Sequence, residues 1–149
     1  MEQTYAMIKP DGVQRGFIGE IISRIERKGL RIVAMRMYRI TDDVACRHYA
    51  EHTEKVFFGS LIDFITSSPV VSMIVEGENA VSVMRTMSGA TNPNDAAFGT
   101  IRGDFGLDVG RNIIHTADSL ESAKREIAIH FTENDVVEYT KAEEAWVYE

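Results

Sequence analysis

The sequence predicts an α+β sandwich in which helices cover one face of a small sheet. Two observations lead to this fold class: only four short segments have the pattern of a strand, and segments with helical periodicity separate them. The 149 residues fit one ordinary domain, residues 1–149, with no internal repeat or linker. A domain of this size buries roughly two thirds of the surface that its unfolded chain exposes, so it needs no disulfide or metal for stability.

The first strand is expected over residues 4–8, where an apolar run ends at a Pro-Asp-Gly turn. A helix follows, because isoleucines recur at the i, i+3, i+4, i+7 spacing of one apolar face, and Gly29 is a natural helix end. A second strand is expected over residues 31–40. Its more apolar face carries Val33, Met35 and Met37.

Thr41 and the two aspartates after it predict a helix N-terminus, with the helix over residues 44–52. A second helix is expected over residues 57–65, and a short buried strand over residues 70–75. Asn79 is in position to cap the next helix, which carries Val83, Met84 and Met87 and ends at Gly89.

Residues 91–111 are expected to form one long glycine-containing loop, and a loop of that length is usually functional or disordered. A short strand over residues 112–116 follows. Asp118, with Glu121 three residues later, resembles a capping box that begins the last helix. The buried face of that helix is expected to contain Leu120, Ala123, Ile127 and Phe131.

Composition excludes several classes of function. The net charge of −7 disfavours a specific nucleic-acid partner, because such proteins usually carry a basic surface. The single Cys46 forms no internal disulfide, and no Cys/His spacing is that of a zinc site. No apolar run approaches the length of about 20 residues that spans a bilayer, and no signal-peptide pattern is present. We therefore expect a cytoplasmic protein that does not bind membranes.

Four residues are candidates for phosphate chemistry: Lys9 at a strand end, Arg85 on a helix, Arg102 in the long loop and His115 at a strand-to-helix junction. The chain has neither a P-loop nor a dinucleotide-binding glycine motif. Taken singly, the three cations are more often surface charges, and a lone histidine is more often structural. The i, i+4 pair His48 and His52 lacks the glutamate placement of a zinc protease, so we expect no metal there.

Three separated motifs occur along the chain: A-T-N-P at 90–93, G-T-I-R-G-D-F at 99–105 and R-N-I-I-H-T-A-D-S at 111–119. With them stand I-K-P-D-G-V at 8–13, H-Y-A-E-H at 48–52, F-F at 57–58 and W-V-Y-E at 146–149. Over these segments, which cover nearly the whole chain, the sequence resembles the nucleoside diphosphate kinase family. Several motifs in one order outweigh the ordinary interpretation of each matching residue.

The resemblance implies a ferredoxin-like βαββαβ sandwich, with helices packed on a four-stranded antiparallel sheet. It also implies an enzyme that transfers the γ-phosphate of a nucleoside triphosphate to a nucleoside diphosphate, by a ping-pong mechanism through phosphorylated His115. Glu126 would orient the imidazole, and Tyr49 would support the phosphate and the histidine. Six residues would bind the nucleotide: Lys9, Phe57, Arg85, Thr91, Arg102 and Asn112. Lys9 would also belong to the catalytic residues, with His115, Glu126 and Tyr49.

Within this set of six, the resemblance implies that Phe57 stacks on the base, that Asn112 contacts the sugar hydroxyl, and that the other four residues hold phosphates or ribose. Mg²⁺ is the implied cofactor, held mainly by the nucleotide's phosphates and by water, with no dedicated metal ligands in the protein. The W-V-Y-E tail resembles that of hexameric family members, which implies a homohexamer with Pro93 at a subunit contact. The alternative function is a catalytically idle module of the same fold that senses nucleotides or binds proteins.

One departure from the family pattern lies beside His115, where the family usually has H-G-S-D-S and this chain has H-T-A-D-S. A β-branched Thr116 tolerates positive φ poorly, so an extended backbone is expected there. Ala117 lacks the serine hydroxyl that, in the family pattern, links the histidine to the glutamate matched by Glu126. Thr116 is a poor substitute, because neighbouring strand residues point to opposite faces.

Overall fold

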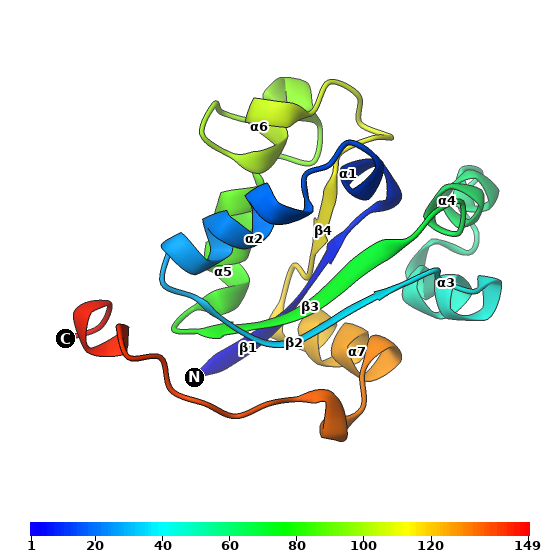
Figure 1. The fold of residues 1–149 in the computed structure, drawn as a ribbon. Coiled ribbons are helices and arrows are strands. Elements are labelled where there is room, and N and C mark those ends of the chain that lie inside the picture. Colours follow the sequence, from blue (N-terminus) through cyan, green and yellow to red (C-terminus); the bar gives the residue numbers. More distant parts are fainter.

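A computed structural model describes residues 1–149 and shows a four-stranded sheet between two layers of helices (Figure 1). The strands follow the order β2-β3-β1-β4 across the sheet, and all neighbouring pairs are antiparallel. Their bounds are Glu2–Ile8 for β1, Arg31–Tyr38 for β2, Val70–Gly77 for β3 and Ile114–Thr116 for β4. The predicted α+β class and antiparallel sheet are confirmed, and the βαββαβ order is confirmed with two further helices inserted between β2 and β3.

Seven α-helices accompany the sheet, with short 3₁₀ turns in the connections and in the C-terminal tail. Their bounds are Pro10–Gln14 (α1), Ile18–Arg27 (α2), Asp42–His48 (α3), Phe58–Ile65 (α4), Ala80–Ser88 (α5), Ile101–Phe105 (α6) and Leu120–His130 (α7). None of these helices is both long enough and apolar enough to cross a lipid bilayer.

The expectation that helices cover one face of the sheet is wrong, because both faces are covered (Figure 1). Along β1, Tyr5 and Met7 belong to the core shared with α3 and α7, while Ala6 and Ile8 belong to the core shared with α2 and α5. Successive strand residues point to opposite faces, so a continuous apolar run is the pattern of a strand buried on both sides.

The predicted first helix is confirmed as α2, with Ile21 and Ile25 fully buried and Gly29 in the left-handed region at φ +99°. The predicted apolar face of β2 is wrong, because Met35 and Met37 are 57% and 58% exposed. A register irregularity between Ile32 and Ala34 is the physical reason. One extra residue in a strand moves the side chains after it to the opposite face.

The predicted helix over residues 44–52 ends earlier, since α3 stops at His48 and a 3₁₀ turn covers Ala50–His52. Its predicted N-terminus is confirmed: the Thr41 side chain accepts a hydrogen bond from the Val44 N–H. Because the helix ends at His48, its last turn and Tyr49 lie beside the sheet edge that carries β4, where His48 meets His115.

Two predicted helix caps differ in the structure. Asn79 occupies the N-cap position of α5 with φ 55°, but its side chain makes no capping bond. Glu2 Oε1 from β1 instead accepts the Val81 N–H at 2.9 Å. The last helix, α7, is capped by Ser119 and not by an Asp118–Glu121 box, because the Ser119 hydroxyl accepts the Ser122 N–H at 3.0 Å.

The predicted apolar face of α7 is only partly correct. Leu120 is 53% exposed, whereas Ala123 and two polar residues, Glu126 and His130, are buried. Burial of a polar side chain is costly without hydrogen-bond partners, so these two residues point to chemistry on this face of the sheet.

The segment 91–111 is not one irregular loop, because it contains a 3₁₀ turn at Pro93–Asp95 and the helix α6. Thr100 begins α6, and its hydroxyl accepts the Gly103 N–H at 3.0 Å. A Cβ at Gly103 would lie 2.0 Å from the Ala97 carbonyl oxygen, so only glycine fits there. These local bonds give the glycine-rich segment a fixed shape beside β4.

Candidate active site

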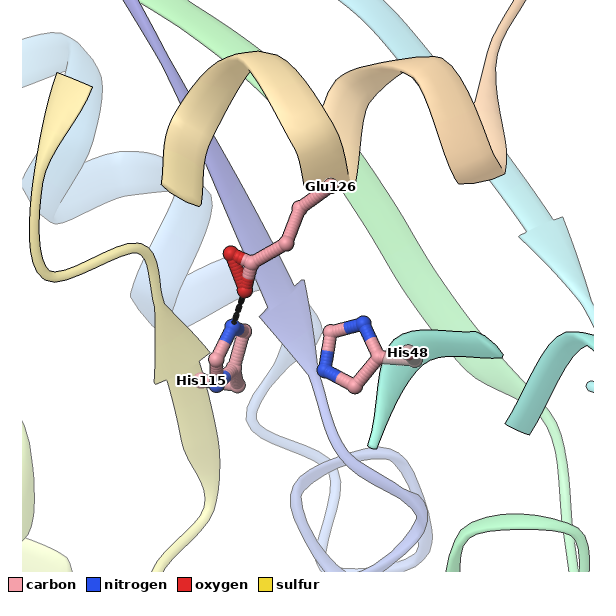
Figure 2. Close-up of side chains that lie close together, drawn as sticks. All are labelled: His48, His115 and Glu126. Atoms are coloured by element: carbon pink, nitrogen blue, oxygen red, sulfur yellow. Dashed lines mark hydrogen bonds and ion pairs between the residues drawn. The ribbon is translucent and has the colours of Figure 1, made fainter. Parts of the chain in front are cut away.

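His115 lies on β4, directly opposite Met7 of β1, at a point where the sheet faces α7. Its Nε2 makes a hydrogen bond with Glu126 Oε1 from α7 (Figure 2). The side chain of His115 is 25% exposed and that of Glu126 is 3% exposed. Because Nε2 is engaged, Nδ1 is the ring nitrogen left to act as a nucleophile.

The backbone just before His115 is strained. Ile113 has φ +77°, which is an outlier for a β-branched residue, and its N–H donates to Asp11 Oδ2 at 3.0 Å. Strain of this kind persists where surrounding contacts enforce it, and it concentrates at functional sites. Thr116 belongs to β4 and does not have positive φ, so its predicted extended backbone is confirmed.

Three cations surround His115, as the sequence motifs led us to expect. Burial, together with the charges of Lys9, Arg102 and Arg85, lowers the pKa of His115 to about 3. The Asp118 carboxylate acts in the opposite direction. The imidazole is therefore neutral at physiological pH, and the potential around it favours anions.

Arg102 has a structural role as well as supplying positive charge. Arg102 is 3% exposed, and its guanidinium donates to the carbonyl oxygens of Gly89, Asn112 and Ile114. Burial and the Arg85 charge lower its pKa to about 10, so it stays charged at neutral pH. Three of its five N–H groups are used in this way, and two remain for a ligand.

Lys9 and Asn112 are bound to one another across 103 positions of the chain, with Lys9 Nζ 2.7 Å from Asn112 Oδ1. The Asn112 amide also donates to the Thr91 carbonyl at 3.0 Å, which fixes the start of the glycine-rich segment. Arg85 donates from α5 to the Thr116 carbonyl at 3.2 Å. These bonds bring the polar residues of three sequence motifs to one end of the sheet.

Tyr49 follows the end of α3, and Phe57 precedes the start of α4. Tyr49 is buried, its ring meets that of His48 edge-on with centroids 4.9 Å apart, and burial raises its pKa to about 12. Phe57 is 47% exposed, and Lys55 Nζ lies 5.4 Å from its ring centroid. The structure thus leaves the Phe57 ring open to a stacking partner.

A cavity of about 160 Å³ opens at His115. Its lining includes residues of β4, α3, α5 and α7 and of the connections beside them: His48, Tyr49, Arg85, His115, Asp118 and Glu126. Of the residues expected in the site, Lys9, Phe57, Thr91, Arg102 and Asn112 do not line this cavity. Lys9, Arg102 and Asn112 adjoin it through their bonds to each other and to the backbone of β4.

Only the i, i+4 spacing with His52 draws attention to His48 in the sequence, and that spacing does not indicate a position beside His115. The His48 and His115 rings meet edge-on with centroids 4.7 Å apart, and His48, His115 and Glu126 place ligand-type atoms within 4.8 Å of one another (Figure 2). Sequence reasoning also missed His130, which is buried on α7. The i, i+4 spacing of Glu126 and His130 was the available signal, because it puts both side chains on one helix face.

Glu126 has one oxygen without a partner. Its Oε1 meets His115, but Oε2 is buried and has no hydrogen-bond partner. The Thr116 hydroxyl is buried and unpartnered as well, so it does not replace the serine hydroxyl that the family pattern places at 117. Burial raises the pKa of Glu126 to about 7, as expected for a carboxyl with few stabilising bonds.

Comparison with known proteins gives consistent matches along the chain. The sequence model of the family described as nucleoside diphosphate kinase matches residues 2–136. The chain is 61% identical to a nucleoside diphosphate kinase of Archaeoglobus fulgidus, over 100% of this chain and 99% of that protein. It is 60% identical to one of Methanosarcina mazei, over 100% of both.

Solved structures give the same result. The halophilic nucleoside diphosphate kinase from Halobacterium salinarum, in complex with CDP, has a TM-score of 0.97 at 49% identity over 99% of each chain. A nucleoside diphosphate kinase family protein from Babesia bovis has a TM-score of 0.97 at 48% identity, over 99% of this chain and 100% of that one. With fold, motifs and relatives in agreement, the chain belongs to the nucleoside diphosphate kinase family and is a phosphotransferase.

Proposed function

We propose that this nucleoside diphosphate kinase transfers phosphate through a covalent intermediate on Nδ1 of His115. The observation that carries the proposal is the bond between His115 Nε2 and Glu126, which leaves Nδ1 as the free nucleophile in a neutral ring. Nδ1 attacks the γ-phosphorus of a nucleoside triphosphate, and the bond from that phosphorus to the bridging oxygen breaks. The diphosphate leaves with the electron pair, and a second diphosphate later takes the phosphoryl group by the reverse step.

Charge on the transferred group is neutralised by Lys9, Arg85 and Arg102, whose combined field already acts on His115. Glu126 accepts the Nε2–H and stabilises the positive charge that develops on the ring during attack. Tyr49 lines the cavity together with His115 and Glu126, and there it would support the phosphate and the histidine. A positioned nucleophile and fixed cations are the main requirements of phosphoryl transfer.

The nucleotide would lie between the open Phe57 ring and the Lys9–Asn112 pair. Phe57 would stack on the base, Asn112 would contact the sugar hydroxyl, and Thr91 would contact a phosphate or the ribose. Stacking discriminates poorly between bases, which fits use of several nucleoside triphosphates and diphosphates. The Halobacterium salinarum enzyme was solved in complex with CDP, which supports a nucleotide as the ligand of this protein.

Mg²⁺ is the proposed cofactor, and the residues present fit a metal held chiefly by the nucleotide. The side chains that come nearest to forming a metal site are those of His48, His115 and Glu126. They offer two imidazole nitrogens and one carboxylate, whereas magnesium prefers oxygen ligands only. When bound to the phosphates, the ion supplies charge neutralisation. His115 and Glu126 are then free for the transfer itself.

A homohexamer is the proposed assembly, and exposed apolar side chains support it. On the edge strand β2, Met35 and Met37 are exposed, and in the segment 91–111 Phe98 and Leu107 are 92% and 83% exposed. Apolar groups on a sheet edge and a loop are typical of subunit contacts. Pro93 is itself buried in the chain, so its neighbours in the segment, and not its own side chain, would supply this contact.

In solution we expect a mass six times that of the 16.7 kDa chain at micromolar concentration. A stable monomer or tetramer would contradict the hexamer. The free, exposed Cys46 fits a reducing compartment, which supports the cytoplasm as the proposed location.

The covalent intermediate is tested by incubating the protein with γ-labelled ATP and separating protein from nucleotide. We expect label on the protein in an acid-labile, alkali-stable form, and its quantitative release when a nucleoside diphosphate is added. Double-reciprocal plots with varied donor and acceptor should be parallel. Intersecting lines and an unlabelled protein would contradict the intermediate, and binding of nucleotide without transfer would support the idle module.

Two shifted pKa values predict a bell-shaped pH dependence of kcat/KM. Below the pKa of Glu126, about 7, the protonated carboxyl donates to Nε2, the ring proton moves to Nδ1 and the nucleophile is blocked. Above the pKa of Lys9, which burial and Arg102 lower to about 8, its positive charge is lost. We therefore expect kcat/KM to be highest between these two values and to fall on either side.

In the profile of kcat, the alkaline limb should move to higher pH, because bound phosphates stabilise the Lys9 ammonium. Initial rates at saturating and at limiting nucleotide separate the two profiles. A kcat/KM that is constant from about pH 5 to 10 would show that neither group controls the reaction.

A further inference from the structure

Five polar side chains, four of them buried and one (Tyr38) half-buried, form a continuous chain of hydrogen bonds behind the active site. The Tyr5 hydroxyl lies 2.6 Å from Ser72 Oγ, which lies 3.1 Å from the Tyr38 hydroxyl. The Tyr38 hydroxyl bonds to His130 Nδ1, and His130 Nε2 lies 3.0 Å from His48 Nδ1. One residue comes from each of β1, β3, β2, α7 and α3, so the chain crosses the sheet and both helices that cover this face.

The chain is embedded in the apolar core of that face. Tyr5 and Ser72 have no exposed surface, and His130 and His48 are 3% and 4% exposed. The Tyr5 ring stacks on His130, with centroids 4.6 Å apart and planes inclined by 13°. Burial of this many polar groups is tolerated only if they are hydrogen-bonded, and here each link has a partner.

This chain of hydrogen bonds ends at the active-site cavity. His48 Nδ1 is bonded to His130, while His48 Nε2 makes no hydrogen bond and lies on the side of the ring that faces His115 (Figure 2). His48 lines the cavity with His115 and Glu126. A side chain that is almost fully buried therefore directs one unpartnered ring nitrogen at the place where phosphate is transferred.

The direction of the protons along the chain follows from the chemistry of the groups. Burial lowers the pKa of His130 to about 3 and that of His48 well below its usual value, so both rings are neutral and each has one donor and one acceptor nitrogen. A phenol is a better donor than acceptor, so the Tyr38 hydroxyl donates to His130 Nδ1. His130 must then donate from Nε2 to His48 Nδ1, and the single proton of His48 must lie on Nε2.

The buried end of the chain favours the same direction. When Tyr5 donates to Ser72 and Ser72 donates to Tyr38, every hydroxyl hydrogen has the next group as its acceptor. The reverse direction makes Tyr5 the last acceptor and leaves its own hydrogen without Ser72 as a partner. An unsatisfied buried donor costs about 1 to 3 kcal/mol, which opposes the reversal.

Positive charges around the chain also keep the rings neutral. The Arg36 guanidinium lies 4.2 Å from the Tyr38 ring centroid and donates to the His130 carbonyl. Arg47 acts on His130, and Arg125 and Lys9 act on His48. A charged imidazole would be repelled by these groups, so His48 contributes to the site through an N–H dipole and not through a net charge.

We propose that the hydrogen bonds linking Tyr5, Ser72, Tyr38 and His130 hold His48 as the Nε2–H tautomer. His48 then donates this hydrogen to the phosphoryl group carried by His115. The proposal rests on the covalent mechanism proposed above. A donor fixed in place before the reaction stabilises developing charge without reorganisation. His48 is then a catalytic residue, and Tyr38 and His130 are positioning residues that act through it.

The test has a spectroscopic part and a kinetic part. In protein labelled with ¹⁵N-histidine, nitrogen chemical shifts distinguish protonated from unprotonated ring nitrogens, and we expect His48 and His130 to carry their protons on Nε2. Tyr38→Phe keeps the ring and removes the donor to His130, so both histidines should become tautomer mixtures. The kcat for transfer should fall about 2- to 10-fold, the range for one neutral hydrogen bond, with KM for nucleotide nearly unchanged.

Three further variants separate positioning from packing. His130→Gln can accept from Tyr38 through its amide oxygen and donate to His48 through its amide nitrogen, so it should retain most of kcat. His130→Leu can do neither, and kcat should fall at least as far as in Tyr38→Phe. Tyr139→Phe is the matched control, because it removes a hydroxyl bonded to the Ile32 carbonyl of β2, far from this chain, and should change neither the shifts nor kcat.

A proton on His48 Nδ1 in the unaltered protein would overturn the proposal, and this measurement does not depend on how well any variant folds. Unchanged kcat in both Tyr38→Phe and His130→Leu would overturn it too. The γ-labelling experiment distinguishes this failure from that of the proposed function. If label enters the protein but these variants have no effect, only the proposed role of the hydrogen-bonded side chains in positioning His48 is wrong. Absence of label contradicts the covalent mechanism itself.

Discussion

Replacement of His115 with alanine is expected to abolish phosphoryl transfer, with kcat lowered by about 10,000-fold or more, the order found when a covalent nucleophile is removed. No other group in the cavity is equipped to replace it. His48 Nδ1 is bonded to His130, and in the tautomer proposed above His48 Nε2 carries the ring proton and has no free lone pair. The Tyr49 hydroxyl has a pKa raised to about 12, so it is not ionised at neutral pH. Transfer from γ-labelled ATP to a diphosphate, measured with label on the protein, checks both activity and intermediate.

The matched control is His52→Ala, since His52 lines the same cavity and makes no contact with Glu126 in the structure. It should retain transfer. Nucleotide affinity should be largely kept in His115→Ala, because Phe57, Lys9 and Asn112 are untouched. Transfer by His115→Ala within 100-fold of the unaltered rate, roughly 3 kcal/mol of barrier, would mean that the nucleophile lies elsewhere.

Local pattern was sufficient for much of the fold. The helix α2 follows from its isoleucine spacing, and the end of that helix from Gly29, because one helix face and one glycine are local features. The face of β2 was not predictable in this way. Its bulge depends on pairing with β3, a segment about 40 positions away, and nothing in Ile32, Val33 or Ala34 identifies the residue that is left unpaired.

The site shows the same division between local and long-range information. The motifs predicted Lys9, Arg102 and Asn112 as residues of the candidate site, but not the bonds among them, because Lys9 and Asn112 are 103 positions apart. Arg102 illustrates this clearly: three of its N–H groups hold backbone carbonyls, a structural role that its motif does not reveal. The chain through Tyr38 and His130 was missed because it is made of ordinary residues that become related only when the sheet is assembled.

Replacement of Ala117 with serine is expected to raise the turnover rate. Ala117 directly follows β4, is 1% exposed, and occupies the position where the family pattern has a serine. Glu126 Oε2 is buried and has no hydrogen-bond partner, so it is free to accept a hydrogen bond from a serine hydroxyl at this position. A hydrogen bond to a charged group contributes about 1.5 to 3 kcal/mol, which as a barrier difference is about 10- to 150-fold in rate.

The same substitution should move the acid limb of the kcat/KM profile. A hydroxyl that donates to Oε2 favours the ionised carboxylate, so the pKa of Glu126 should fall below its present value of about 7. Activity that is now lost as the pH falls through that value should then persist to lower pH. This shift separates a bond to Glu126 from a general improvement in packing, which would leave the limb in place.

Two controls accompany Ala117→Ser. Ala117→Cys adds nearly the same volume with a weak donor, so it should give little of the gain and little of the shift. Thr116→Val removes a buried hydroxyl that has no partner, and should leave the rate unchanged. If Ala117→Ser alters neither turnover nor the acid limb, then Glu126 is already held well enough by His115, and the vacant Oε2 has no catalytic consequence.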